Sequence, residues 1–142
     1  MQKYIIIDTN VIIDMLQRDT QEHQNAYKVY EKLRKENYFV IIPYSGLFEV
    51  LTVLKRDKVN KGRLQFVHDQ NFELQFKPIP IDDKFFDRYN DPDLPYTKTG
   101  DMLFLAIAKK ENAPLITEDK KLYEAAKQCR VKVYKINDFL NS

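Results

Sequence analysis

The sequence predicts an α/β fold: a three-layer α/β/α sandwich around a central, mostly parallel β-sheet. Short apolar runs alternate with longer segments whose apolar residues recur every three or four positions, which is the pattern of strands alternating with helices. The first run, Tyr4 to Ile7, is aromatic and β-branched throughout, as is typical of a central strand buried on both faces. At 142 residues, the chain is expected to form one domain over residues 1–142.

The composition favours a globular protein of a reducing compartment. Hydrophobic residues make up 44% of the sequence and charged residues 31%, which argues against disorder. No apolar run approaches the ~20 residues of a membrane span, so we expect no membrane partner. The single cysteine, Cys129, cannot form an intramolecular disulfide, and we expect a cytoplasmic location. A net charge of +2 does not by itself indicate a nucleic-acid partner.

Local patterns place the elements of the first half. After the first strand we expect a short helix ending at Leu16, a helix from Asp19 to Asn37, a strand over 38–42, a helix with Ser45 as its N-cap, and a helix over 59–70. In the second half, Pro78 and Pro80 argue against a central strand in the extended segment 77–81.

Further elements follow from turn residues and apolar spacing. We expect a short helix capped by Asp82 or Asp83, a loop over 90–98 and a strongly apolar helix from Thr99. After these we expect a strand over 115–117, a helix with Leu122, Ala125 and Ala126 inward, a strand over 131–134 and a closing turn over 136–140. The loop is too short to link two domains.

Four acidic residues stand at element boundaries or inside otherwise apolar helices: Asp8, Glu49, Asp101 and Asp119. Asp8 and Asp119 follow apolar strands, at the strand ends where open α/β sheets bind ligands. Structural explanations exist for the other two. Asp101 is favourable in the first turn of a helix because of the helix dipole, and Glu49 could belong to a polar stripe that faces water. For Glu49 the pattern favours neither alternative.

If these four carboxylates converge, their like charges repel one another and destabilise the fold. A hard divalent cation, Mg²⁺ or Mn²⁺, relieves that repulsion because it prefers oxygen ligands. The chemistry that most often uses such a site is phosphodiester hydrolysis, in which metal activates a water molecule and stabilises the leaving oxygen. The acids therefore suggest a metal-dependent nuclease.

Four segments of the chain resemble the PIN-domain family, metal-dependent ribonucleases that include the toxins of VapBC-type toxin–antitoxin pairs. They are IIIDTNVII at 5–13, the apolar helix carrying Glu49, GDMLFLAIAKK at 100–110 and PLITEDKKL at 114–122. The resemblance implies a PIN-like fold in which the four acids are catalytic and Asp8, Asp101 and Asp119 bind the metal. It also implies a hydrogen-bonding role in support of the site for Thr117 and a structural role for Asn10.

The resemblance implies partners as well: RNA as substrate, a second copy in a homodimer, and a small antitoxin that inserts into the site. Lys98, Lys120 and Lys121 are candidate phosphate contacts. One position departs from the family pattern, because many members carry a further acid where this chain has Lys121. We expect a thinner set of ligands there. Glu118 could substitute, but its side chain should point in another direction.

Other functions are less well supported. An aspartyl-phosphate phosphatase needs an acid two residues after the first, where this chain has Asn10, which cannot supply a proton. Ser–His–Asp catalysis, a zinc site and a glycine-rich phosphate loop all lack their residues. The serious alternative is a catalytically retired PIN-like domain that binds RNA or a protein. Four mutually repelling carboxylates argue against it, because a retired site has no physical reason to keep them.

Overall fold

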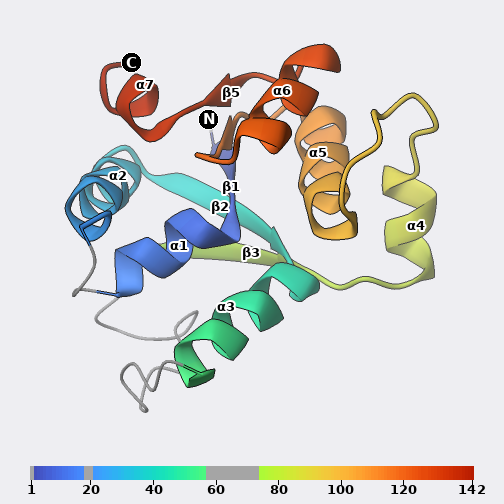
Figure 1. Ribbon diagram of the computed structural model, residues 1–142. Helices are drawn as coiled ribbons and strands as arrows, with labels where there is room; N and C mark the ends of the chain where they lie inside the picture. Colours follow the sequence, from blue (N-terminus) through green and yellow to red (C-terminus); the bar gives the residue numbers. More distant parts are fainter. Residues whose placement is uncertain (1, 18–20, 57–73) are drawn as a thin grey trace.

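A computed structural model of the protein describes residues 2–17, 21–56 and 74–142 (Figure 1). In this part of the chain five strands form one sheet in the order β3-β2-β1-β4-β5, and all neighbouring strands are parallel. The strands are β1 (Lys3–Ile7), β2 (Tyr38–Pro43), β3 (Gln75–Ile79), β4 (Leu115–Ile116) and β5 (Val133–Tyr134). The helices are α1 (Thr9–Leu16), α2 (His23–Lys35), α3 (Tyr44–Arg56), α4 (Asp83–Tyr89), α5 (Thr99–Glu111), α6 (Lys120–Gln128) and α7 (Ile136–Leu140).

The central strand β1 is buried on both faces, as its sequence predicts. Ile5 and Ile7 pack into a core with residues of α1, α2, α3 and α7, whereas Ile6 packs on the opposite face with residues of α4, α5 and α6. Each fully buried isoleucine side chain contributes roughly 1.5–3 kcal/mol to folding. The helices therefore form a layer on each side of the sheet, which confirms the predicted α/β/α sandwich (Figure 1).

The start of α3 and the structure of residues 136–140 differ from the predictions. Ser45 does not cap α3, because the helix begins at Tyr44, immediately after β2 ends at Pro43. A Cβ added to Gly46 would lie only 3.1 Å from Ile42 Cγ1, so the glycine lets the first turn of α3 pack directly against β2 without a loop. The segment expected to form a closing turn over 136–140 is the short helix α7, whose Ile136 and Phe139 are buried.

Other expectations hold or lie outside the described residues. The segment with two prolines contributes β3, which contains Pro78 and lies at the edge of the sheet, where proline is tolerated. Asp82 caps α4 by accepting a hydrogen bond from the Phe85 backbone N–H at 2.9 Å. The predicted helix over 59–70 and the helix start at Asp19 lie outside the described residues. Among those described, no helix combines the length and the apolar character that a membrane crossing requires.

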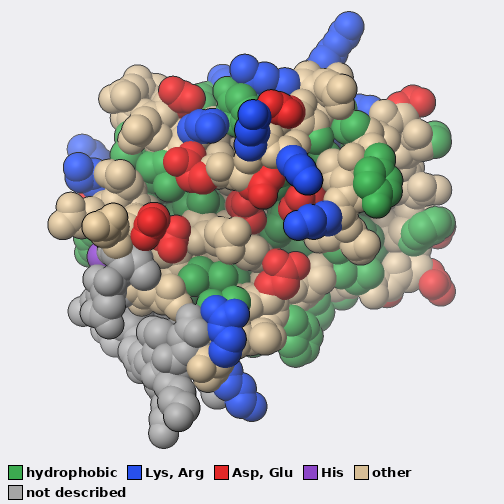
Figure 2. All heavy atoms as spheres, viewed as in Figure 1, with side chains coloured by type: hydrophobic (Ala, Val, Ile, Leu, Met, Phe, Trp, Pro, Cys, Tyr) green, Lys and Arg blue, Asp and Glu red, His purple; other side chains and the backbone are tan. Residues whose placement is uncertain are grey.

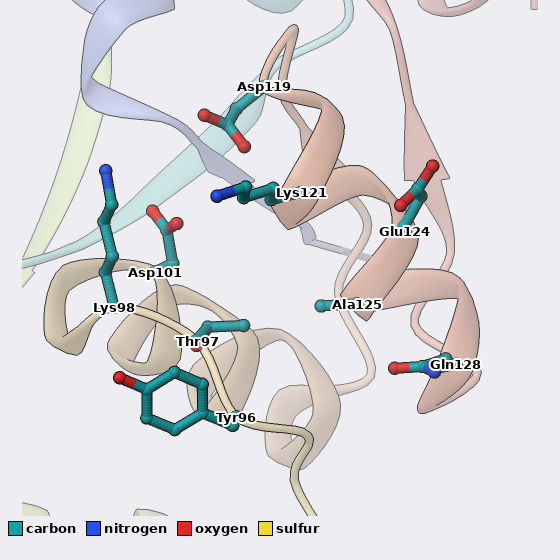
Figure 3. A pocket seen from close by; sticks show the side chains of 9 residues that line it. All are labelled: Tyr96, Thr97, Lys98, Asp101, Asp119, Lys121, Glu124, Ala125 and Gln128. Carbon is teal, nitrogen blue, oxygen red and sulfur yellow. The ribbon is translucent and has the colours of Figure 1, made fainter.

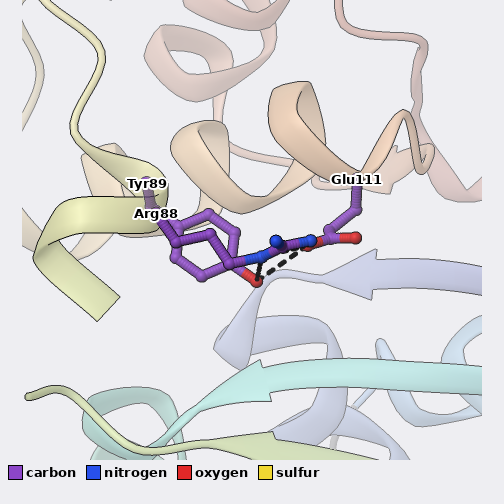
Figure 4. Close-up of polar contacts among 3 residues, drawn as sticks. All are labelled: Arg88, Tyr89 and Glu111. Carbon is purple, nitrogen blue, oxygen red and sulfur yellow. Dashed lines mark hydrogen bonds and ion pairs between the residues drawn. The ribbon is translucent and has the colours of Figure 1, made fainter. Parts of the chain in front are cut away.

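A group of polar contacts fastens α4 to the end of α5 (Figure 4). Glu111 Oε1 accepts hydrogen bonds from Arg88 Nε at 3.0 Å, Arg88 Nη2 at 2.7 Å and the Tyr89 hydroxyl at 2.8 Å. Burial alone would raise the pKa of Glu111, but the hydrogen bonds from Arg88 and Tyr89 outweigh burial and lower it. Two residues after Tyr89, Asp91 forms a salt bridge with Lys109 at 2.8 Å. The start of the loop over 90–98 is thereby fixed to α5.

Candidate active site

The candidate site lies where the strand order reverses. The chain passes from β1 to β2 and β3 on one side, and later returns to β4 and β5 on the other. Asp8 directly follows β1 and Thr117 directly follows β4, and the two strands pair through Ile7 and Ile116. Such a topological switch point is where open α/β sheets form ligand-binding crevices.

The hydroxyl of Thr117 connects two of the four acids. It donates a hydrogen bond to Asp8 Oδ2 at 2.8 Å and accepts one from the Asp119 backbone N–H at 3.0 Å. Thr117 itself has no exposed surface, so solvent does not compete for either bond. The two hydrogen bonds fix Asp8 relative to the first residues after β4.

Asp8 is a buried carboxyl group with only 6% of its surface exposed. Burial is the main cause that raises its pKa, and the charge of Asp119 adds to this effect. The Thr117 hydroxyl, the Asn10 backbone N–H and the Thr9 hydroxyl act in the opposite direction. Asp8 occupies the N-cap position of α1, but its carboxylate makes no capping hydrogen bond of good geometry, so the Asn10 N–H acts on it mainly as a nearby dipole.

Glu49 reaches the site from α3. Its Oε2 accepts a hydrogen bond from the buried Thr9 hydroxyl at 3.0 Å. The same hydroxyl lies 3.5 Å from Asp8 Oδ1, but it carries one proton, and the shorter contact with Glu49 is the better hydrogen bond. Glu49 is solvent-exposed, as a residue of a polar stripe would be, and yet it is held beside Asp8, as a residue of the site would be. It therefore combines features of both alternatives that its sequence pattern left open. Sequence reasoning missed Thr9, although its place next to Asp8 was a usable signal.

Asp101 is half-buried in the first turn of α5, and its pKa is raised. Burial is the main cause, followed by the negative charges of Asp8 and Asp119, with Glu49 adding a smaller effect. The positive charge of Lys98 opposes these effects. The fold therefore brings all four acids close enough to act on one another, although they come from separate parts of the chain.

Asp119 has a structural task in addition to its place near the other acids. It is the N-cap of α6, and its Oδ1 accepts a hydrogen bond from the Leu122 backbone N–H at 2.9 Å. Its carboxylate points into the same space as the side chains of Asp101 and Lys121 (Figure 3). Glu118, in contrast, is turned toward α7, where its Oε2 accepts a hydrogen bond from the Ile136 backbone N–H at 3.0 Å. Glu118 therefore does not substitute for the acid that Lys121 replaces.

A pocket of about 530 Å³ opens beside Asp101 and Asp119 (Figure 3). It is lined by Tyr96, Thr97, Lys98, Asp101, Asp119, Lys121, Glu124, Ala125 and Gln128. Acidic side chains gather at the centre of this face of the molecule, with basic side chains next to them (Figure 2). Lys98 and Lys121 thus line the pocket, whereas Lys120 is exposed outside its lining and Asn10 is exposed beside Glu49. Sequence reasoning also missed Tyr96.

The donor chemistry of the site fits a hydrated divalent cation. Within the described ranges, no three Asp, Glu, His or Cys side chains are gathered tightly enough to hold one ion together. Mg²⁺ does not require this, because it usually binds through one or two carboxylates and keeps several water molecules. The acid oxygens are also the ligand type that hard cations prefer.

Comparison with known proteins agrees with this fold. The PIN domain family model matches residues 5–128, and the chain belongs to the PIN-domain family. Among solved structures it is similar to VapBC2 from Rickettsia felis bound to a DNA fragment from its promoter, with 20% identity, a TM-score of 0.64 and coverage of 93% of this chain and 98% of that one. FitAcB from Neisseria gonorrhoeae is similar at 19% identity and a TM-score of 0.63, covering 93% and 97%. A PilT N-terminus domain protein from Sulfolobus solfataricus is similar at 16% identity and a TM-score of 0.54, covering 97% and 91%.

At these identities the structural likeness concerns the fold. The search of curated proteins gave no match.

Proposed function

We propose that this protein is a metal-dependent endoribonuclease that hydrolyses phosphodiester bonds of RNA through Mg²⁺ or Mn²⁺. One observation carries the proposal: four carboxylates from separate elements lie near the topological switch point, where burial and mutual repulsion raise the pKa of Asp8 and Asp101. Such an arrangement costs stability in the metal-free protein. Binding of a cation and a phosphate substrate would offset this repulsion and explain why the four acids lie near one another.

Each side chain has a proposed role. Asp8, Asp101 and Asp119 would hold the cation directly or through water. When bound, the cation would activate a water molecule and stabilise the leaving oxygen. Glu49, exposed and oriented by Thr9, would place the attacking water. Thr117 would act as a positioning residue, because its hydroxyl fixes the Asp8 carboxylate.

Lysines would hold the phosphates of the RNA. Lys98 and Lys121 are the better candidates because both line the pocket beside Asp101 and Asp119. Lys120 remains a proposed phosphate contact outside that lining. With Lys121 in place of a further acid, the site offers fewer ligands for a second cation.

The family resemblance leads us to propose further features of this protein. These are a single domain over 1–142, a cytoplasmic location, a homodimer, and a small antitoxin that silences the site. Two of the similar structures are VapBC2 bound to a promoter fragment and FitAB bound to a DNA fragment, which motivates the search for such a partner.

A second candidate function is a catalytically retired PIN-like domain that binds RNA or a protein. Two observations favour it: Lys121 stands beside the acids, and the described acids are not gathered into a tight metal cage. Like the nuclease, this module would bind RNA, but it would not need the charges of Asp8 and Asp101.

The two candidates are separated by one cleavage assay. Purified protein is incubated with a mixed-sequence single-stranded RNA and Mn²⁺, Mg²⁺ or EDTA. The Asp8→Asn/Asp101→Asn variant is tested beside an Asp87→Asn/Asp138→Asn variant, which makes the same charge change at exposed positions outside the pocket.

The nuclease requires cutting by wild type and control, with loss of cutting in EDTA and in the Asp8→Asn/Asp101→Asn variant. Absence of cutting in all proteins, together with equal RNA binding, would favour the binding module. Cutting that persists in EDTA would contradict the metal-dependent mechanism.

A further inference from the structure

Tyr96 is the most exposed large apolar side chain that the structure describes. It is 95% exposed, whereas the others in this class range from 43% to 67%. Its ring contacts no other aromatic ring of the described residues. A single exposed aromatic residue is common on protein surfaces. The surroundings of Tyr96 must therefore decide whether it has a function.

Those surroundings are the acidic pocket. Tyr96 lines it together with Asp101 and Asp119, and its ring lies at the end of the pocket away from Asp119 (Figure 3). Lys98 and Lys121 also line it, and their ammonium groups lie beside Asp101, away from the ring (Figure 3). Neither ammonium group forms a salt bridge within the described ranges, so both are available for an anionic ligand. One pocket thus has an aromatic ring at one end and two lysines together with the acids at the other.

The loop that carries Tyr96 is fastened at both ends. At its start, Asp91 forms its salt bridge with Lys109, and the Leu94 backbone N–H donates to the Asp91 carbonyl at 3.3 Å. At its end, the Lys98 carbonyl accepts the first hydrogen bond of α5, from the Met102 N–H at 2.9 Å. Because the ends of this loop are anchored, a ligand that stacks on Tyr96 loses less conformational freedom than one that must first order a loop.

We propose that Tyr96 stacks against a nucleobase of single-stranded RNA while Lys98 and Lys121 bind the adjacent phosphates. The inference rests on the proposed function and adds to it the class of substrate. Proteins bind single strands by combining aromatic platforms with basic grooves, and stacking accepts any base because every base has a π-face. Bases inside a duplex already stack on one another and cannot cover the ring. The site therefore selects single-stranded segments with little sequence preference.

The binding test compares two ligands of equal charge. One is a dye-labelled oligouridylate of about ten nucleotides, within the usual range of single-strand sites. The other is an abasic ribose-phosphate strand of the same length. Fluorescence anisotropy is recorded with Ca²⁺ in place of Mg²⁺, and gel electrophoresis verifies that the strands stay intact.

Tyr96→Ala should weaken binding of oligouridylate about 5- to 150-fold, the usual loss for one stacked base, and leave binding of the abasic strand unchanged. Tyr96→Phe keeps the ring and should bind as wild type does. Phe86→Ala removes another exposed aromatic side chain, outside the pocket, and should have no effect.

A spectroscopic reading supports the same test. The chain contains no tryptophan, so Tyr96→Trp introduces a single reporter at the proposed platform. Oligouridylate should quench its fluorescence by stacking, and the abasic strand should not.

Equal quenching by both strands, equal binding by Tyr96→Ala and wild type, or no binding by wild type would each overturn the stacking. Failure of the nuclease proposal remains distinguishable. RNA cutting lost in the Asp8→Asn/Asp101→Asn variant but insensitive to Tyr96 would reject stacking alone. A base-dependent quench without any metal-dependent cutting would reject the nuclease alone.

Discussion

Replacement of Thr117 by valine isolates the hydrogen bonds that position Asp8. The two side chains have nearly the same shape, so Thr117→Val removes the hydroxyl without leaving a cavity. It deletes the 2.8 Å bond to Asp8 Oδ2 and the 3.0 Å bond from the Asp119 N–H. A hydrogen bond to a charged group contributes about 1.5–3 kcal/mol, and the neutral one about 0.5–1.5 kcal/mol. Because Asp119 is exposed and water can replace its partner, we expect the free energy of unfolding to fall by about 2–3 kcal/mol near neutral pH.

The loss should depend on pH, because the Thr117 hydroxyl lowers the pKa of Asp8. Without it the pKa of Asp8 rises further, and each unit of that rise corresponds to about 1.4 kcal/mol. The deficit relative to wild type is therefore complete where Asp8 is ionised in both proteins. It shrinks as the pH falls through the pKa values of Asp8. In a cleavage assay, the pH below which activity declines should move upward.

Urea unfolding at about pH 8 and about pH 5, without metal, tests this prediction. Thr97→Val is the matched control, because the buried Thr97 hydroxyl has no hydrogen-bond partner in the described structure. Its removal should be neutral or slightly stabilising. Equal stability of Thr117→Val and Thr97→Val, or an equal deficit at both pH values, would contradict a role of the Thr117 hydroxyl in holding the ionised Asp8.

Three further predictions concern the acids. Asp101→Asn relieves repulsion and removes a ligand, so it should raise the melting temperature of the metal-free protein and weaken the further rise on adding Mn²⁺. A lower melting temperature with an unchanged Mn²⁺ response would show that the acids do not share a site. Folding raises the pKa of Asp8 and Asp101 above the ordinary value of 3.8, so above pH 3.8 the folded state binds more protons than the unfolded state. The metal-free wild type should therefore lose stability as the pH rises through the folded pKa values of these groups. Thermal melts should show this fall of melting temperature with pH in wild type and a smaller fall in Asp8→Asn/Asp101→Asn. Gly100→Ala should keep or raise stability, because alanine has the higher helix propensity. Its Cβ would lie 3.1 Å from Glu49 Oε1 and displace that carboxylate, so cleavage should fall in an assay at matched folded fraction. Unchanged cleavage would argue against a role for Glu49.

Much of the fold was predictable because the signals are local. The β-branched run before Asp8 defines a central strand wherever it is placed, and Pro78 excludes its own strand from the middle of the sheet. The predicted cap at Ser45 is wrong because the close packing of Gly46 against Ile42 is a tertiary contact that no local pattern contains.

The candidate site also has some features that local sequence signals predict and others that depend on tertiary contacts. The positions of Asp8 and Asp119 after strands can be read from the sequence, since parallel strands end at one edge of the sheet. The hydrogen bond between Thr9 and Glu49 depends on how α1 packs against α3, and the exposure of Tyr96 depends on how its loop lies over the pocket. Neither follows from residue types and spacing alone.

The Thr117–Asp8 hydrogen bond spans 109 residues of sequence, which has a consequence for synthesis of the protein. A ribosome delivers Asp8 before β4, and the hydroxyl that fixes Asp8 arrives only 109 residues later. Until then β1 lacks one of its two neighbouring strands, and no completed sheet holds the acids of the candidate site near one another. Chains that end before β4 should therefore be inactive, so the proposed nuclease would not cut RNA before β4 has been translated.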